Sequence, residues 1–404
     1  MASERTAARR SPAPSARWLA YLVAAALALN LASGRAQVAA EPDPIRIDVI
    51  VSDLGSRADR GILERRVAEA WAARVQRTGG VFGLPVQVEV RSDASDPDRA
   101  VRQVEAAIAD GAHAVVCCST ATASRRVAAT AAAARIPLLS VTAGGRPEAA
   151  GWQFVLAPSD TVALQAVVRD GYERGVRGFG LMTLEGAFGD EAADRFASFL
   201  GVPDLRVVGE ARYGPTQAPL TPEALWVATR VPDAIVVWGL PDDTVRAVRA
   251  LDARGWRGPI YLRSALAEPA SGGLPTGLSG DVRVMVSPAS LPELAPDSEP
   301  ASWRHDARAL GDGRLESRPF AADGARMHDA LELLRRAAEN AVAYGVPVGD
   351  VASFRLALRD AFVSLPPTTL AAGRYAPGER STDAATADGL VAAVLESGRL
   401  VPDR

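Results

Sequence analysis

The stretch from Ala112 to Gly145 constrains the fold more than any other part of the sequence. It holds two short apolar runs, Ala114 to Cys118 and Ile136 to Leu139, and each run is followed by a polar turn. An alanine-rich segment lies between them. Short apolar runs of this kind are typical of buried parallel strands, and alanine favours a helix. The pattern therefore predicts a strand, a turn, a helix, a second strand and a second turn.

The two polar turns are the first candidate ligand contacts. Ser119 and Thr120 follow the first of these strands, and Thr142 and Gly144 follow the second. In an open parallel sheet both turns lie at the carboxyl ends of strands, where ligands bind. Hydroxyl groups and the free N–H groups at the start of a helix suit a small polar molecule. The stretch therefore predicts binding of a small molecule rather than catalysis.

The same alternation of strands and helices continues on both sides of this stretch. Strand patterns at Ile45 to Ser52 and Val86 to Arg91 precede it, and a second series begins after Pro158 that includes the apolar run Ala234 to Trp238. Alternating strands and helices predict parallel sheets with crossover helices. Two comparable α/β halves predict two lobes joined by several crossovers, with a ligand held between the lobes.

Composition excludes several classes of function. The chain has 404 residues, of which 48% are hydrophobic, and its net charge is −3. A mildly acidic protein lacks the basic stripe that nucleic-acid binding needs. The sequence contains no lysine, which removes the P-loop lysine and the Schiff-base lysine as mechanisms.

The first 40 residues resemble a secretory signal. A basic segment precedes the apolar run Trp18 to Ala32, which is short for a membrane span. Small residues suitable for cleavage follow it. We expect residues 1–40 to be a cleaved signal peptide and the protein to be periplasmic. An uncleaved membrane anchor is the alternative.

The histidines and cysteines give no catalytic or metal site in the sequence. The three histidines are dispersed, and His113 and His328 fall in a predicted buried strand and helix. The two cysteines, Cys117 and Cys118, are adjacent, which we interpret as two small buried apolar residues because a disulfide between neighbours would be strained. The sequence contains neither the nucleophile elbow of a hydrolase nor the dinucleotide fingerprint of a dehydrogenase. We expect no enzyme activity, metal or cofactor.

Several short segments resemble, in order, the motifs of one known family. They are Arg77 to Val86 (RTGGVFGLPV), Asp93 to Pro97 (DASDP), Ile136 to Gly145, Phe154 to Asp160 (FVLAPSD), Phe188-Gly189, Pro232 to Gly239 (PDAIVVWG), Met327 to Ala330 (MHDA) and Gly398 to Val401. In this order and spacing, the chain resembles the type I periplasmic solute-binding proteins of ABC uptake systems, in the branch that binds leucine, isoleucine and valine.

The resemblance implies an α/β fold with two Rossmann-like lobes on parallel sheets and a hinge of several crossovers. It places residues 41–157 and 287–375 in one lobe and residues 158–286 and 376–404 in the other. It implies a monomer that delivers a small molecule to an ABC permease in the membrane by closing a cleft. A ligand-sensing module of the same fold, acting as a regulator or receptor partner, is the alternative.

The resemblance also assigns ligand contacts to particular residues. Ser119 and Thr120 match the turn that binds the ligand carboxylate in amino-acid binders, and Thr142 and Gly144 match the second turn. Phe188, in a predicted loop over residues 184–189, stands where the family often has a tyrosine from the other lobe. Trp238 falls near another aromatic contact. Phe188 and Trp238 are equally compatible with a place in the core.

Three departures from the family pattern bear on the ligand. Amino-acid binders carry an acidic residue near Arg263 to hold the α-ammonium group, and the next acid here is Glu268. Arg60 stands where an aromatic residue often precedes a glycine. Ser95 replaces the first cysteine of a disulfide common in the branch, which leaves Cys118 unpaired. Because Arg60 and Arg263 can pair with carboxylates, an organic acid or amide fits better than a branched-chain amino acid; both arginines are also compatible with a solvated place at the cleft edge.

Overall fold

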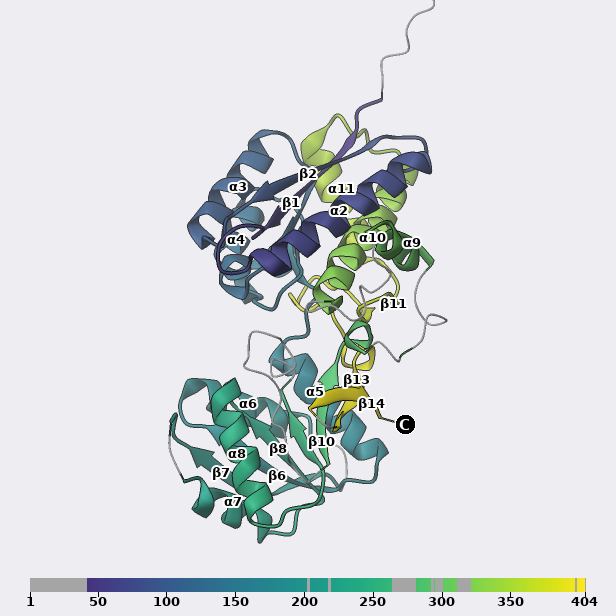
Figure 1. The fold of residues 1–404 in the computed structure, drawn as a ribbon. Helices are drawn as coiled ribbons and strands as arrows, with labels where there is room; N and C mark the ends of the chain where they lie inside the picture. The colour runs from purple at the N-terminus through teal and green to yellow at the C-terminus, as the bar shows by residue number, and fades with distance from the viewer. Residues whose placement is uncertain are drawn as a thin grey trace, which may run out of the picture. The chain divides into compact units, whose positions relative to one another are not determined.

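The computed structural model describes residues 42–201, 204–216, 219–263, 281–291, 294, 301–310, 321–396 and 398–403. Apart from Pro42, all of these belong to one compact unit, Asp43–Arg404. The predicted signal peptide and Glu268 lie outside the described residues. The unit contains two main sheets, and each sheet with the helices that pack on it is described here as one lobe (Figure 1).

The first lobe is built on a five-stranded sheet in which every pair of neighbours is parallel. The strand order is β2-β1-β3-β4-β5. The strands are β1 (Ile45–Val51), β2 (Val86–Ser92), β3 (Ala114–Cys117), β4 (Leu138–Ser140) and β5 (Gln153–Val155). Parallel pairing places the carboxyl ends of all five strands at the same edge.

Helices cover both faces of this sheet, as the alternation of buried residues along β1 requires (Figure 1). Ile47 and Val49 belong to the apolar cluster formed with helices on one face, and Ile50 belongs to the cluster on the other. The first face carries α2 (Ala58–Arg77), α10 (Ala321–Ala343) and α11 (Val351–Val363), with α9 (Ala301–Ala309) packed on α2. The second carries α3 (Pro97–Ala109) and α4 (Ala121–Ala133).

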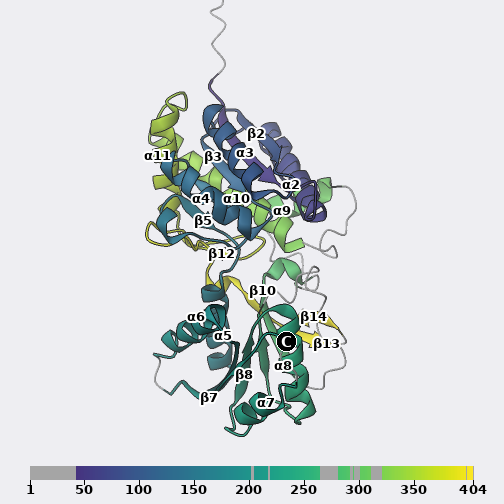
Figure 2. The ribbon, with the colours of Figure 1, turned by 90° about the vertical axis from the view of Figure 1, so that its left-hand side faces the viewer.

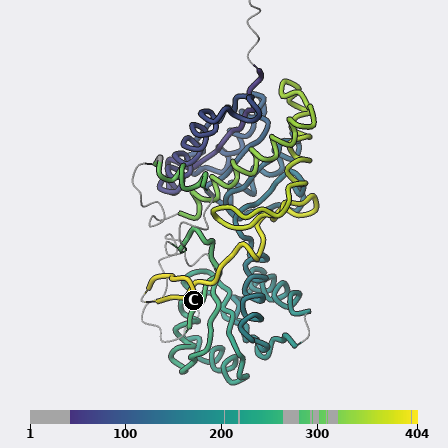
Figure 3. Tube along the Cα trace, turned by 90° about the vertical axis from the view of Figure 1, so that its right-hand side faces the viewer, coloured from purple at the N-terminus to yellow at the C-terminus, as the bar shows by residue number. Residues whose placement is uncertain are grey.

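Segments far apart in the sequence therefore complete this lobe together. The trace in Figure 3 shows the late helices beside the early ones, and the packing of α10 on α2 and β3 agrees with it. The sheet strands end at Val155, whereas α10 begins only at Ala321.

The second lobe is built on a seven-stranded sheet, ordered β14-β13-β10-β9-β8-β6-β7. The strands from β10 to β7 are parallel, and β13 and β14 add an antiparallel edge that Figure 2 shows beside β10. The strands are β6 (Gly178–Leu184), β7 (Arg206–Tyr213), β8 (Ala234–Trp238), β9 (Ile260–Leu262), β10 (Val282–Val286), β13 (Val391–Glu396) and β14 (Arg399–Pro402).

Four helices form the two apolar layers on this second sheet. One layer contains α7 (Thr221–Ala228) and α8 (Pro241–Ala253), and the other contains α5 (Asp160–Glu173) and α6 (Ala187–Ser198). The alternation along β8 shows the split, because Ile235 and Val237 face the first layer while Val236 and Trp238 face the second. Every residue of β8 is buried, as its apolar run predicts.

Three connections carry the chain between the two sheets. The first connection, residues 156–159, follows β5; the second, residues 287–291, follows β10; and the third, residues 370–390, leads to β13. The third connection includes β12 (Arg374–Tyr375), which pairs with β11 (Thr368–Thr369).

Candidate functional site

The two predicted turns are neighbours at the carboxyl edge of the first sheet. The hydroxyl of Thr142 donates a hydrogen bond of 2.9 Å to the carbonyl of Cys118, which joins the turn after β4 to the turn after β3. Gly144 has φ +134°, and a Cβ there would lie 2.6 Å from the carbonyl oxygen of Ala121. Glycine is therefore needed where the second turn approaches the start of α4. Which of these groups contact a ligand stays a prediction.

Ser119 and Thr120 have different surroundings within the first turn. Ser119 is fully buried; its hydroxyl accepts the N–H of Ser52 at 2.8 Å and donates to the carboxylate of Glu64. A serine hydroxyl has one hydrogen to donate, so in this structure that hydrogen serves the fold. Thr120 is half-buried and caps α4 by accepting the N–H of Ala123 at 3.2 Å, which leaves its own hydroxyl hydrogen for another acceptor.

Arg60 lies beneath the first turn as part of a buried ion network. Its Nη1 donates to the carbonyl of Ser119 at 3.0 Å, and its Nη2 lies 3.2 Å from a carboxylate oxygen of Asp323. Arg60 is 5% exposed, so the alternative of a solvated arginine at the edge is wrong for this residue. We expected Arg60 to pair with a carboxylate of the ligand, and in the structure it pairs with the carboxylate of Asp323.

The network extends to the second turn through the same acid. Asp323 also pairs with Arg326, and the Nε of Arg326 donates to the carbonyl of Val141 at 3.0 Å. Two arginines therefore hold the backbone of the two turns, and one buried carboxylate joins them.

Sequence reasoning missed Glu64, Asp323 and Arg326. Their only local signal is spacing: Arg60 and Glu64 stand four residues apart on α2, on the face that also buries Leu63 and Val67. Charged residues on the buried face of an amphipathic helix must find partners inside the protein. The positions of those partners, on α10, cannot be read from α2.

Two buried acids at this edge, Glu64 and Asp93, have raised pKa values. Burial, and then the carboxylate of Asp323, raises the pKa of Glu64 to about 8, although Arg60 and Ser119 act in the opposite direction. Its Oε1 is buried without a hydrogen-bond partner. Burial also raises the pKa of Asp93, which accepts a hydrogen bond of 2.6 Å from the hydroxyl of Ser52. The low polarity of this edge therefore favours neutral carboxyl groups.

The second lobe presents an arginine, an acid and an aromatic ring together. Arg263 directly follows β9, and its Nε and Nη2 lie 2.6 and 3.2 Å from the two carboxylate oxygens of Asp160, at the start of α5. Its guanidinium lies 5.1 Å from the centroid of the Phe188 ring. Phe188 is half-buried and lies in the first turn of α6, not in the predicted loop.

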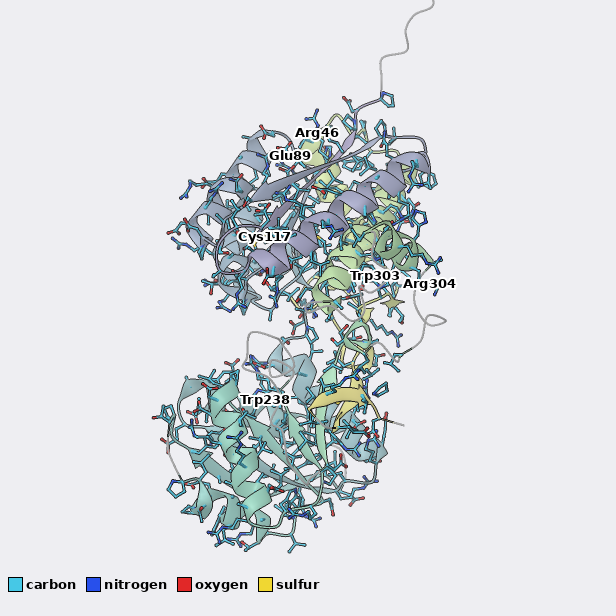
Figure 4. All side chains as sticks on the ribbon, viewed as in Figure 1. Arg46, Glu89, Cys117, Trp238, Trp303 and Arg304 are labelled. Carbon is cyan, nitrogen blue, oxygen red and sulfur yellow. A yellow bond between two sulfur atoms is a disulfide. The ribbon has the colours of Figure 1, made fainter. Side chains whose placement is uncertain are left out.

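Trp238 was predicted either to contact the ligand or to lie in the core, and in the structure it lies in the core. Its side chain is fully buried in the apolar layer with α5 and α6, and Figure 4 labels it within the second lobe. Its Nε1 has no hydrogen-bond partner. In this structure Trp238 supports the fold of the edge and presents no surface to a ligand.

The pairing expected for the cysteines is wrong, although their burial is confirmed. Cys117 and Cys118 are both fully buried, and the structure joins them in a disulfide across a cis peptide bond. Cys118 is therefore paired with its neighbour rather than left unpaired by the change at Ser95. Figure 4 labels Cys117 in the first lobe.

His113 and His328 are both buried and interact with groups of the protein itself. The Nδ1 of His113 accepts the N–H of Arg46 at 2.9 Å, and burial lowers its pKa to about 4. His328 is fully buried between Asp306 and Asp329. Within the part of the chain that the structure describes, no group of histidine, cysteine and acidic residues could hold a metal ion.

A family model for periplasmic binding proteins matches residues 44–374, which is most of the sequence. The chain belongs to the periplasmic binding proteins. This membership implies a periplasmic location and confirms the resemblance seen in the motifs. Across the described ranges, none of the helices combines the length and the apolar character that a membrane span requires.

Solved structures of type I members have the same fold as this chain. One, from Rhodospirillum rubrum, is provisionally assigned to a branched-chain amino acid ABC transporter; it is 20% identical over 89% of this chain and 100% of that chain, with a TM-score of 0.70. The leucine-binding protein LivK from Thermotoga maritima is 16% identical over 89% and 98%, with a TM-score of 0.58. LivJ from Streptococcus pneumoniae, solved with isoleucine, is 15% identical over the same shares, with a TM-score of 0.57.

These likenesses confirm the predicted fold class, an α/β protein with two lobes on parallel sheets. At such low identity they show the fold and no ligand. No curated protein matches the sequence.

Proposed function

We propose that this protein is the solute-binding component of an ABC uptake system and acts without catalysis. It binds a small polar molecule as a monomer, closes its two lobes around it and presents it to a permease in the membrane. The observation that carries the proposal is the pair of joined turns after β3 and β4, held from beneath by Arg60 and Arg326. Such an arrangement orients hydroxyl and N–H groups for binding, and its hydroxyl–carboxylate pair, Ser119 with Glu64, is fully buried.

The ligand class that we favour is a small organic acid or amide, with an amino acid as the alternative. The charged groups of the second lobe bear on this choice. Arg263 and Asp160 pair with each other while their side chains stay 24% and 35% exposed. A ligand carboxylate that approaches Arg263 would replace Asp160, whereas a ligand ammonium would be attracted by Asp160 itself. Asp160 therefore supplies an acid beside Arg263 that the sequence comparison did not indicate.

A thermal-shift screen of the purified protein tests the proposal. The panel contains amino acids, the matching carboxylic acids without the amino group, and the matching amides. A ligand that binds only the folded state raises the melting temperature. If the acids and amides raise it more than the amino acids do, the favoured class is supported; the reverse order supports the alternative. A panel without any shift contradicts the proposal for these solute classes.

The turn is tested with the compound that gives the largest shift. Thr120→Ala removes the hydroxyl that caps α4 and whose hydrogen is left for another acceptor, so the shift should fall to a small fraction of its original size. Thr120→Ser restores the hydroxyl and should restore the shift. Thr130→Ala, on the same helix, serves as the matched control. A shift that survives Thr120→Ala and Thr142→Ala together would exclude these turns as the binding site.

A further inference from the structure

A buried carboxylate on α10 holds the start of the third connection. Asp329 is fully buried and accepts the N–H of Ala371 at 3.1 Å, the N–H of Ala372 at 2.7 Å and the hydroxyl of Tyr375 at 3.0 Å. Both of its oxygens are used, and burial together with this carboxylate raises the pKa of Tyr375 well above its usual value. Hydrogen bonds to an ionised acceptor are roughly twice as strong as those between neutral groups. This contact therefore fixes the backbone at residues 371–375.

The second connection is bonded to the same residue, Ala372. Ser287, the residue after β10, is 5% exposed and donates its hydroxyl to the carbonyl of Ala372 at 2.6 Å. The short helix of residues 288–290 that follows it packs on α10. Ala372 is therefore held through its N–H by Asp329 and through its carbonyl by Ser287, so that two of the three connections meet at one residue.

The first connection meets the third at a different place. The N–H of Val155 donates to the carbonyl of Thr382 at 2.6 Å, and the N–H of Ala384 donates to the carbonyl of Val155 at 2.9 Å. Ser159 donates to Asp383 at 2.8 Å. Val155 and Ala384 are buried, but none of these bonds reaches α10, so they form a contact separate from that of Asp329.

We propose that Asp329 is the positioning residue of the hinge. It fastens the second and third connections to α10 of the first lobe as one rigid unit, so that the lobes move by bending between this unit and the second sheet. The proposal rests on the proposed function, because only a protein whose lobes move needs a defined hinge. It gives a role to the Met327 to Ala330 motif, which the ligand site does not use.

The test uses the ligand-free protein and the matched variants Asp329→Asn and Asp306→Asn. Both replace a fully buried aspartate by its isostere. Asp306 lies on α9 and pairs with Arg74 of α2 at 2.9 Å, so it contacts the first lobe alone. The first readout is amide hydrogen exchange at residues 371 and 372. Both carboxylate oxygens of Asp329 accept a hydrogen bond, and the isostere keeps one of these acceptors. Exchange there should therefore speed up on the order of tenfold or more in Asp329→Asn, and not in Asp306→Asn.

The second readout separates a hinge role from a purely structural one. Spin labels at Arg125→Cys on α4 and Arg249→Cys on α8, both exposed positions, report the distribution of distances between the lobes. The distribution should broaden in Asp329→Asn and stay unchanged in Asp306→Asn. Equal distributions in the two variants would overturn the proposal, even if both lower the melting temperature.

Ser287→Ala keeps the test decisive if Asp329→Asn does not fold. This variant removes one hydrogen bond, between the second connection and Ala372, and leaves Asp329 in place. It should broaden the distance distribution by a smaller amount without changing exchange at residues 371 and 372. An unchanged distribution would again overturn the proposal. Because no readout uses a ligand, these results do not depend on whether the solute screen succeeds.

Discussion

The carboxyl edges of the two sheets carry similar residue types in opposite environments. In the first lobe, Arg60, Glu64 and Asp323 are 5%, 0% and 3% exposed; Arg60 pairs with Asp323, and both Arg60 and Glu64 bond to Ser119 of the first turn. In the second lobe, Arg263 and Asp160 form a pair whose side chains are 24% and 35% exposed. The charged side chains of the first edge are buried, and those of the second edge are partly exposed to solvent.

This difference suggests that the charged groups of the first edge hold the turns in place, whereas those of the second edge can contact a ligand. A buried ion pair stabilises little in net terms, but removing one partner leaves an uncompensated charge in a region of low polarity. The first edge therefore fixes its turns in one geometry. A partly exposed pair contributes little to stability, so the second edge can exchange partners when a charged ligand arrives. Three substitutions test this contrast.

The largest effect is expected from Arg60→Met. The change keeps most of the side-chain volume but leaves Asp323 with one arginine fewer, next to Glu64. We expect the free energy of unfolding to fall by about 3–5 kcal/mol, as for other broken buried pairs. Urea denaturation followed by circular dichroism measures it. A loss below about 1 kcal/mol would show that the first edge is as exposed to solvent as the second.

A smaller, pH-dependent effect is expected from Glu64→Gln. The pKa of Glu64 is raised from 4.5 to about 8 by burial and by Asp323, so between these values the folded state binds a proton that the unfolded state has lost. Its contribution to stability is therefore complete below about pH 4.5 and is lost as the pH rises through about 8. The free energy of unfolding should fall with pH less steeply in Glu64→Gln than in the wild type.

Denaturation curves at several pH values between about 5 and 8 measure this difference. His113, whose pKa burial lowers to about 4, titrates in both proteins and cancels in the comparison. Parallel pH profiles would mean that Glu64 is ionised at neutral pH, and that the first edge contains water.

The smallest effect on stability is expected from Arg263→Met. The exposed pair with Asp160 contributes less than about 1 kcal/mol, so the unfolding free energy should change little. The same variant should weaken binding of an acidic ligand identified in the solute screen. Arg249→Met, an exposed arginine on α8, controls for the loss of one positive charge. A loss of stability as large as that of Arg60→Met would remove the contrast between the two edges.

The sequence predicted several strands well, because β8 is a continuous apolar run and β1 alternates apolar and polar residues before a run of three apolar ones. Ile45 to Ser52 and Ala234 to Trp238 match β1 and β8 to within a residue. Helix starts were less accurate: α4 begins at Ala121, several residues before its apolar part, because Thr120 caps a first turn that carries polar residues. A strand of three residues such as β5 contains too little pattern to distinguish it from a connection.

The site was predicted in position but not in detail. Ser119, Thr120, Thr142 and Gly144 belong to one continuous stretch, so parallel pairing alone brings their two turns to one edge. Asp323, by contrast, is more than 250 residues from Arg60 in the sequence, and only the packing of α10 on α2 makes them partners. The burial of Trp238 likewise depends on helices from another part of the second lobe.

The late position of α10 and α11 also affects how the chain matures during synthesis. All five strands of the first sheet are made before residue 321, and until then one apolar face lacks α10 and α11. The second sheet waits longer still, since β13 begins only at Val391. Exposed apolar faces and unpaired strand edges are what general chaperones bind. Neither half can therefore reach its final form until segments far along the chain have been made.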